Sequence, residues 1–88
     1  MEIKFSPDAW EQYVCWQGRD KRTIKRINEL LKDIVRGNPY EGIGKPEPLK
    51  GVLSGFWSRR IDESNRLVYR IVGGVCQIAQ CKGHYGDN

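Results

Sequence analysis

The sequence predicts an α+β fold in which a short N-terminal strand and a helical hairpin are followed by strands, with the hairpin packed on one face of a small antiparallel sheet. Three observations predict it: an alternating apolar segment opens the chain, two amphipathic helical segments follow, and three β-like segments close it. The chain has 88 residues, a length that suits one domain, 1–88, with a single core.

The first part of the chain predicts a strand and then a helix. Ile3 and Phe5 alternate with charged residues, which is the period of a strand with one buried face. The triplet Ser6-Pro7-Asp8 offers a helix cap, a proline for the first turn and an acid that suits the positive end of the helix dipole. The helix should run from about residue 7 to residue 17. Apolar residues expected to share its buried face are Ala9, Tyr13 and Trp16. All three tryptophans of the chain are expected in the core, namely Trp10, Trp16 and Trp57.

A second helix should lie between Asp20, a candidate N-cap, and Gly37, a candidate stop. Apolar residues recur along it at helical spacing: Ile24, Ile27, Leu31 and Ile34. Cations dominate its opposite face: Lys21, Arg22, Lys25, Arg26, Lys32 and Arg36. Such a face is most often simply solvated, but contact with phosphate or an acidic partner stays open.

The second half of the chain predicts a long loop and three strands. Between residues 37 and 55 the periodicity disappears and glycine and proline accumulate, a composition typical of a functional loop. Strands are then expected at 56–61, 66–72 and 75–82. Gly73-Gly74 suits a two-residue hairpin turn between the last two strands, and residues 62–65 form a second hairpin loop.

Strand alternation indicates which side chains face the helices. The apolar set assigned to that side is Leu67, Tyr69 and Ile71, together with Trp57 and Ile61. Arg66 then points to the opposite, open face, because side chains alternate along a strand. Arg60 should point outward as well. Arg59 is ambiguous, either near the sheet edge or reaching around it, so Arg60 is the favoured contact for phosphate.

Composition narrows the classes of function. The net charge of +4 makes a polyanionic partner plausible, although this charge is also ordinary for a soluble protein. The three cysteines show no C-x-x-C spacing, which argues against a disulfide framework or a zinc site and favours reduced, mostly buried thiols. No signal peptide or apolar run of membrane-spanning length is found, so we expect a cytoplasmic protein without a membrane partner. We also expect neither a metal nor a cofactor.

The side chains that carry chemistry are a lone histidine, a carboxylate between two prolines, and clustered arginines. His84 is the only histidine, and Glu47 lies between Pro46 and Pro48, which restrict its backbone. Metal-independent cleavage of RNA, in which a 2′-hydroxyl attacks the adjacent phosphodiester, can use a carboxylate as general base, an imidazole as general acid and fixed positive charge. From the residues alone, a solvated loop acid and an ordinary surface His84-Tyr85 pair remain open alternatives.

Four ordered blocks of the sequence resemble one family. They are KPEPLK at 45–50, LSGFWSRRI at 53–61, RLVY at 66–69 and HY at 84–85. In this order and spacing they closely resemble the YoeB toxins of the RelE/ParE superfamily of bacterial toxin–antitoxin systems, and the likeness covers nearly the whole chain. The resemblance implies a RelE/ParE-like, microbial-ribonuclease-like fold and a ribosome-dependent endonuclease that cuts mRNA in the ribosomal A site. It also implies inhibition by a YefM-type antitoxin, indirect contact with operator DNA through that antitoxin, and a homodimer as a further expectation.

The resemblance assigns roles residue by residue. The catalytic set falls on Glu47 as general base, His84 as general acid, Arg66 as phosphate stabiliser and Tyr85 as a positioning aromatic. The phosphate-binding set falls on Lys50 and Arg60, with Arg59 as a further candidate. The chain departs from some relatives at Asn65, where they carry a histidine, at Gly83, where they carry a bulky residue, and in its tail after Tyr85.

Two other classes of function stay open. A ParE-like toxin would inhibit a topoisomerase through protein contacts and would need neither Glu47 nor the His84-Tyr85 pair. A basic module that binds nucleic acid or an antitoxin would catalyse nothing. Mapping of message cleavage on ribosomes separates these classes from the nuclease.

Overall fold

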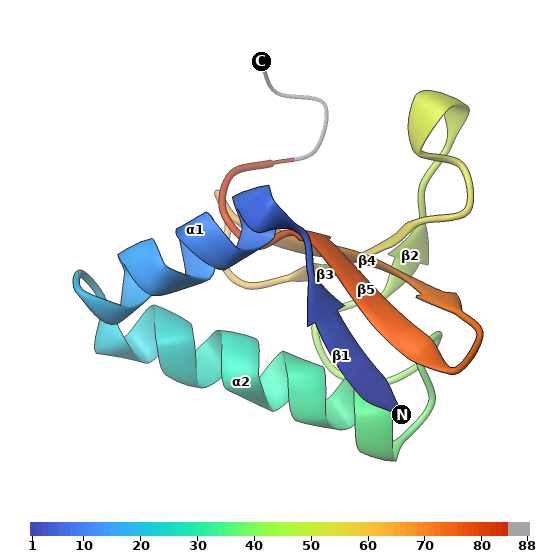
Figure 1. Ribbon diagram of the computed structural model, residues 1–88, viewed down its shortest axis with the longest axis horizontal. Helices are drawn as coiled ribbons and strands as arrows, with labels where there is room; N and C mark the ends of the chain where they lie inside the picture. Colours follow the sequence, from blue (N-terminus) through green and yellow to red (C-terminus); the bar gives the residue numbers. More distant parts are fainter. Residues whose placement is uncertain (85–88) are drawn as a thin grey trace.

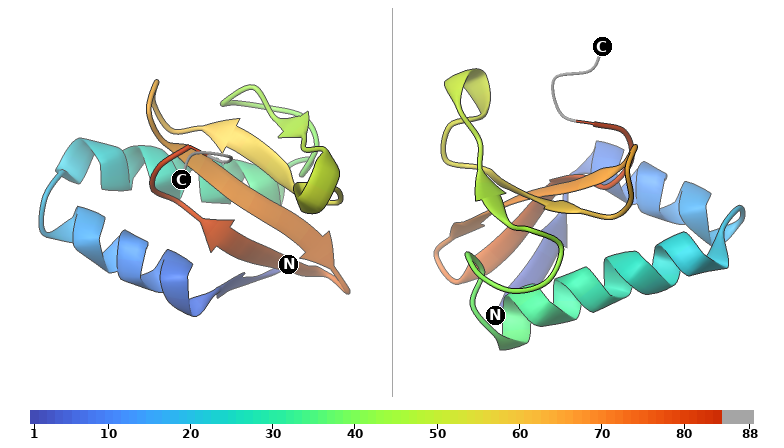
Figure 2. Two further views of the ribbon diagram at one scale, coloured as in Figure 1. Left: turned by 90° about the horizontal axis from the view of Figure 1, so that it is seen from above. Right: turned by 180° about the vertical axis from the view of Figure 1, so that it is seen from behind.

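The computed structural model describes residues 1–84 and confirms the α+β architecture. The helices are α1 (Pro7–Gln17) and α2 (Lys21–Arg36), with a short 3-10 turn η1 (Gly51–Leu53). The strands are β1 (Glu2–Phe5), β2 (Glu47–Pro48), β3 (Trp57–Arg60), β4 (Arg66–Val72) and β5 (Val75–Gln80). Both helices lie on one side of the sheet, and η1 projects away from α2 beyond the opposite side (Figures 1 and 2).

The sheet is mixed rather than purely antiparallel. Its strand order is β1-β5-β4-β3-β2, and every neighbouring pair is antiparallel except β1 and β5, which are parallel. The first strand therefore lies beside the last one. Parallel neighbours need a long crossover between them, and here the helical hairpin and strands β2 to β4 supply it.

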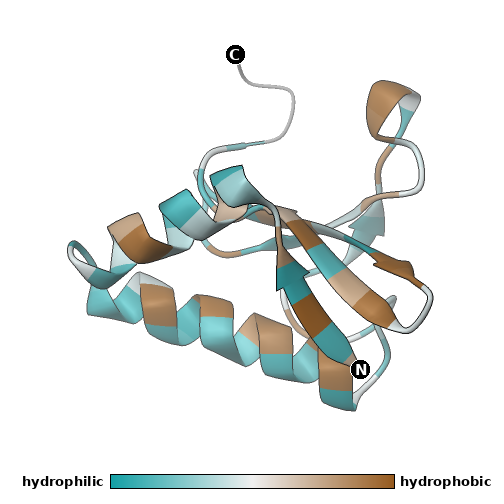
Figure 3. Ribbon diagram, in the orientation of Figure 1, coloured by the Kyte–Doolittle hydropathy of each residue, from teal (hydrophilic) through white to brown (hydrophobic). Residues whose placement is uncertain are grey.

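Local signals place the helices where the sequence predicts them. The Ser6 hydroxyl accepts a hydrogen bond from the backbone N–H of Ala9 at 3.0 Å, and the Asp20 carboxylate accepts two from the start of α2. The apolar side of α2 faces α1 and the sheet, while its hydrophilic residues face outward (Figure 3). Its basic side is thus largely exposed.

The core lies between the two helices and the sheet. Its buried residues from the helices are Ala9, Trp16, Ile27, Leu30, Leu31 and Ile34, and those from the sheet layer are Ile61, Leu67, Tyr69, Cys76, Ile78 and Cys81. Trp57 and Ile71 pack against this cluster, which confirms the assignment of strand faces. The expectation for Trp10 was wrong: its side chain is 50% exposed, at the edge of an aromatic cluster with Phe5 and Tyr13. Position 10 is rotated by about 100° from the buried Ala9.

The cysteines are reduced, as expected. Cys76 and Cys81 are buried, and burial raises their pKa values to about 11 and about 12. Cys15 is only half-buried, and a hydrogen bond from Arg19 lowers the pKa of its thiol. Within residues 1–84, no helix is long and apolar enough to cross a membrane.

Candidate active site

The register of the sheet gathers the predicted site residues on the open face, away from the helices. Arg60 of β3 is paired with Arg66 of β4. Paired residues on neighbouring strands point to the same side of a sheet, and both alternate with core-facing residues, so the two arginines share the open face. Glu47 of β2 is paired with Ser58, which lies two residues from Arg60 on the same side. At about 3.3 Å per residue, the Glu47 row therefore lies about 7 Å along the strands from the row of the arginine pair.

Arg66 is on the predicted face but is less open than expected. Only 8% of its surface is exposed, because its Nη1 donates hydrogen bonds to three carbonyls of the neighbouring hairpin loop, those of Asp62, Glu63 and Asn65. These bonds fix the direction of the guanidinium. A positive charge held in this way is already oriented before a phosphate arrives.

The segment that carries His84 is attached to the same end of β4. The carbonyl of Gly83 accepts a hydrogen bond from the backbone N–H of Arg66 at 2.9 Å, and the N–H of Gly83 donates to Oδ1 of Asn65 at 2.7 Å. Asn65 is anchored in turn, because its side-chain amide donates to the Asp62 carboxylate at 3.0 Å. His84, which is partly buried, follows directly.

Gly83 and Asn65, two of the three departures noted from the sequence, are thus hydrogen-bonded partners. Gly83 has a φ of +82°, a conformation that glycine adopts without strain. The role of Asn65 was missed because a contact between residues 65 and 83 has no local sequence signal.

Lys50 lies beside Glu47 in one hollow at the edge of the sheet. Both are exposed, and Pro48, Leu49 and Leu53 complete the lining. The assignment of a positioning aromatic to Tyr85 lies outside the described residues. Within residues 1–84, no cluster of three or more His, Cys, Asp or Glu side chains is arranged to hold a metal ion.

Arg59 is an internal residue and not part of the open face. Its side chain is fully buried on the helix side of the sheet, in register with the core residue Leu67. Its acceptors are the Asp33 carboxylate, the Tyr69 hydroxyl and the carbonyls of Asn38, Pro39, Glu41 and Ile43. The ion pair holds the pKa of Asp33 below its usual value. The expectation that Arg59 binds phosphate was therefore wrong. Its guanidinium N–H groups hold the loop before β2 against α2.

The resulting open face combines a carboxylate, two guanidiniums and the imidazole-bearing segment. Such a set can remove a proton, deliver a proton and stabilise negative charge on phosphate oxygens.

Strand alternation alone could have separated Arg59 from Arg60, because adjacent residues of a strand face opposite sides.

Comparison with known proteins identifies the family of this chain. A family described as "YoeB-like toxin of bacterial type II toxin-antitoxin system" matches residues 5–85. Toxin YoeB of Escherichia coli K12 is 54% identical over 85 residues, covering 97% of this chain and 100% of that protein. Two solved structures from Staphylococcus aureus, a YoeB–YefM heterotetramer and a YoeB dimer, each show 52% identity and a TM-score of 0.89, covering 97% of this chain and 98% of theirs. This chain belongs to the YoeB-like toxins of bacterial type II toxin–antitoxin systems.

Proposed function

We propose that this toxin is a ribosome-dependent endoribonuclease that cleaves mRNA in the ribosomal A site and so stops translation. The observation that carries the proposal is the sheet register, which puts Glu47, Arg60 and Arg66 on one face. The backbone bond between Gly83 and Arg66 brings the His84 segment to the same place. Family membership supports the proposal.

The reaction is an attack of an RNA 2′-hydroxyl on the adjacent phosphate. The Glu47 carboxylate takes the hydroxyl proton, the O2′–P bond forms, and the P–O5′ bond breaks. Protonated His84 gives its proton to the departing O5′, leaving a 2′,3′-cyclic phosphate and a 5′-hydroxyl. Arg60, Arg66 and Lys50 stabilise the charge that develops on the phosphoryl oxygens, each by a few kcal/mol at most.

Single changes in the message and in the protein test this mechanism. A message with a 2′-deoxy nucleotide directly 5′ of the cut should still bind on the ribosome but should resist cleavage at that bond, because the nucleophile is missing. Early products of the unmodified message should carry a cyclic phosphate, detected by mass spectrometry. Cleavage of the 2′-deoxy bond at the normal rate would point to water as the nucleophile.

His84→Gln and Glu47→Gln should each reduce the single-turnover rate on ribosomes by about 100-fold or more, the lower end of general acid–base effects. Ribosome binding should stay close to that of the wild-type protein. Lys32→Gln, on the exposed side of α2, is a matched control that should not change the rate. Cleavage by His84→Gln at the wild-type rate would remove the general-acid assignment, and inhibition of a topoisomerase without message cleavage would favour a ParE-like function.

We further propose a YefM-type antitoxin as the partner in the cytoplasm, on the strength of the heterotetramer formed by the Staphylococcus aureus relative. A segment with acidic side chains set against Arg60 and Arg66 would suit the charge of the open face. It should block cleavage in a titration and shift His84 from its place in the unbound toxin. A complex with the open face empty would contradict this arrangement. The dimeric relative supports a homodimer as the state of the unbound toxin, which sedimentation can test.

A further inference from the structure

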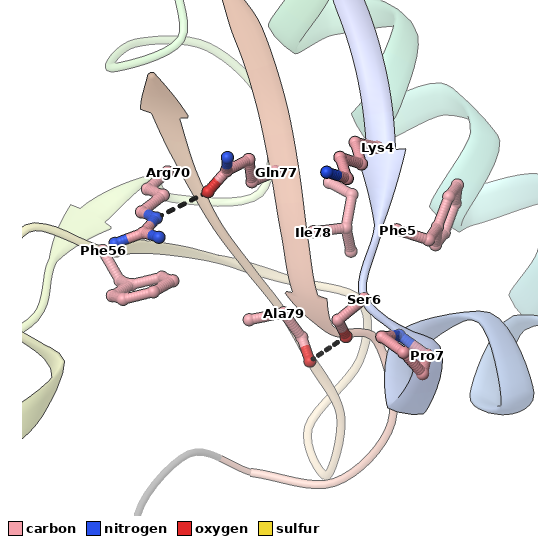
Figure 4. Close-up of a pocket in the computed structure, with 9 residues that line it drawn as sticks. All are labelled: Lys4, Phe5, Ser6, Pro7, Phe56, Arg70, Gln77, Ile78 and Ala79. Carbon is pink, nitrogen blue, oxygen red and sulfur yellow. Dashed lines mark hydrogen bonds between the residues drawn. The ribbon is translucent and has the colours of Figure 1, made fainter.

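Next to the candidate active site, a row of side chains crosses the same open face. Lys4 of β1 is paired with Gln77 of β5, and Gln77 is paired with Arg70 of β4. The Arg70 guanidinium lies over the ring of Phe56, with its central carbon 4.9 Å from the ring centroid. We call these four residues, Lys4, Gln77, Arg70 and Phe56, the platform (Figure 4).

Arg70 is held from two sides. Its Nε donates a hydrogen bond of 2.7 Å to Oε1 of Gln77, and the Phe56 ring lies next to its guanidinium. The residue is nevertheless exposed. A guanidinium held by an aromatic ring and an amide can stack on a nucleobase and can bind phosphate oxygens through its remaining N–H groups.

The platform borders a cavity of about 290 Å³. Pro7, Ala79 and the ring of Phe56 give the cavity an apolar part, and Lys4 and Arg70 are its charged residues. Phe5 and Ile78 also border the cavity, but their side chains pack into the core. Among residues 1–84, no acidic residue lines it. An apolar surface with planar stacking groups and two cations matches a nucleotide, which joins a flat base to an anionic phosphate.

The platform also continues the candidate active site. Arg70 and Arg66 lie on one strand and on one face, four residues and therefore about 13 Å apart. The Glu47–Ser58 row lies between their positions. An RNA strand that runs from Arg66 past the Glu47–Ser58 row therefore reaches the platform at Arg70.

We propose that this cavity binds a nucleotide of the message that flanks the cut, with the base against Arg70 and the apolar lining and a phosphate near Lys4. The inference rests on the proposed nuclease function and adds a subsite for single-stranded RNA to it. The platform contributes to affinity for the message and takes no part in proton transfer.

The main test separates binding from chemistry. Arg70→Gln and Phe56→Leu should each raise the toxin concentration that gives half-maximal single-turnover cleavage by about 5- to 10-fold, as expected for loss of one stacked base. The limiting rate should change less than about twofold. Arg70→Lys keeps the positive charge but lacks the planar guanidinium, so its half-maximal concentration should lie between those of Arg70→Gln and the wild-type protein. Lys32→Gln is the charge-matched control, and unchanged unfolding midpoints verify that the variants fold.

A message with an abasic nucleotide identifies the ligand. If the cavity holds a base of the message, the penalty for Phe56→Leu should shrink to less than about twofold when the abasic site replaces that one flanking nucleotide. The same penalty with every abasic message would show that the platform contacts ribosomal RNA or protein, and would overturn the proposal. A penalty seen only in antitoxin binding would assign the cavity to that partner and would overturn it equally.

A second measurement is independent of cleavage. A short fluorescent single-stranded RNA should bind Arg70→Gln at least about fivefold more weakly than the wild-type toxin, because one stacked base is lost. Binding to Lys4→Gln should show a salt slope smaller by about one, because one phosphate contact is lost. Equal affinity and equal slope would refute the subsite. Absence of message cleavage by the wild-type protein would contradict the proposed function instead, so the two failures are distinguishable.

Discussion

Asp33→Asn removes the charge that balances the buried Arg59 guanidinium and leaves the size of the side chain unchanged. Breaking a fully enclosed ion pair typically costs about 3–5 kcal/mol of stability. Here the Asp33 side chain is 33% exposed while that of Arg59 is 0% exposed, so water screens the carboxylate in part. Arg59 also keeps its hydrogen bonds to Tyr69 and to the loop carbonyls. We therefore expect a loss of about 2–3 kcal/mol in the free energy of unfolding.

Urea denaturation followed by tryptophan fluorescence measures this loss, since Trp16 and Trp57 lie in and against the core. The expected loss corresponds to a fall in Tm of about 10–20 °C for a domain of this size. Glu29→Gln is the matched control on the same helix, because Glu29 is exposed, and it should change stability by less than about 0.5 kcal/mol. A loss below 0.5 kcal/mol for Asp33→Asn would refute the reasoning.

The pH dependence gives a second check with a definite sign. The guanidinium of Arg59 lowers the pKa of Asp33 in the folded protein below the ordinary value of 3.8. The carboxylate therefore stabilises the fold fully at pH values above 3.8, and this contribution is lost as pH falls through the lower, folded pKa. The stability difference between the wild-type protein and Asp33→Asn should be constant from pH 7 to about pH 5 and should shrink below pH 4. A difference that does not change with pH would show that the ion pair is not its cause.

Three further changes probe the site, the loop and the core. Asn65→Ala removes the acceptor for the Gly83 N–H, so it should lower the single-turnover cleavage rate by about 10-fold with little change in half-saturating concentration; an equal rate would show that this contact does not position His84. Gly44→Ala should destabilise the protein by about 2 kcal/mol or more in urea denaturation, since φ there is +80° and a Cβ would lie 2.7 Å from Leu30. Near pH 7.5, a disulfide reagent such as Ellman's should label Cys15 quickly but Cys76 and Cys81 only in urea. Burial raises the pKa values of these two thiols, whereas the pKa of Cys15 is lowered. Equally fast labelling of all three thiols in the folded protein would contradict this burial.

The sequence by itself determined the elements that depend on near neighbours. The N-terminal ends of α1 and α2 are determined by Ser6 and Asp20. Their side-chain oxygens accept hydrogen bonds from backbone N–H groups two or three residues further along the chain. The Gly73-Gly74 turn has positive φ at both residues, as a two-residue hairpin requires. The bounds of β4 and the faces of its side chains also follow from local alternation, because period and turn chemistry act within a few residues.

Only the tertiary structure decided the contacts between distant segments. The parallel pairing of β1 with β5, the two-residue strand that places Glu47 beside Ser58, and the bond between Asn65 and Gly83 join residues that have no local relation. The burial of Arg59 depends on acceptors from α2, β4 and the loop at 38–43. The local sequence around an arginine is the same whether its guanidinium binds a phosphate at the surface or a buried carboxylate of the same chain. The folded chain decides between them, because a buried guanidinium is stable only where several acceptors from separate segments meet around it.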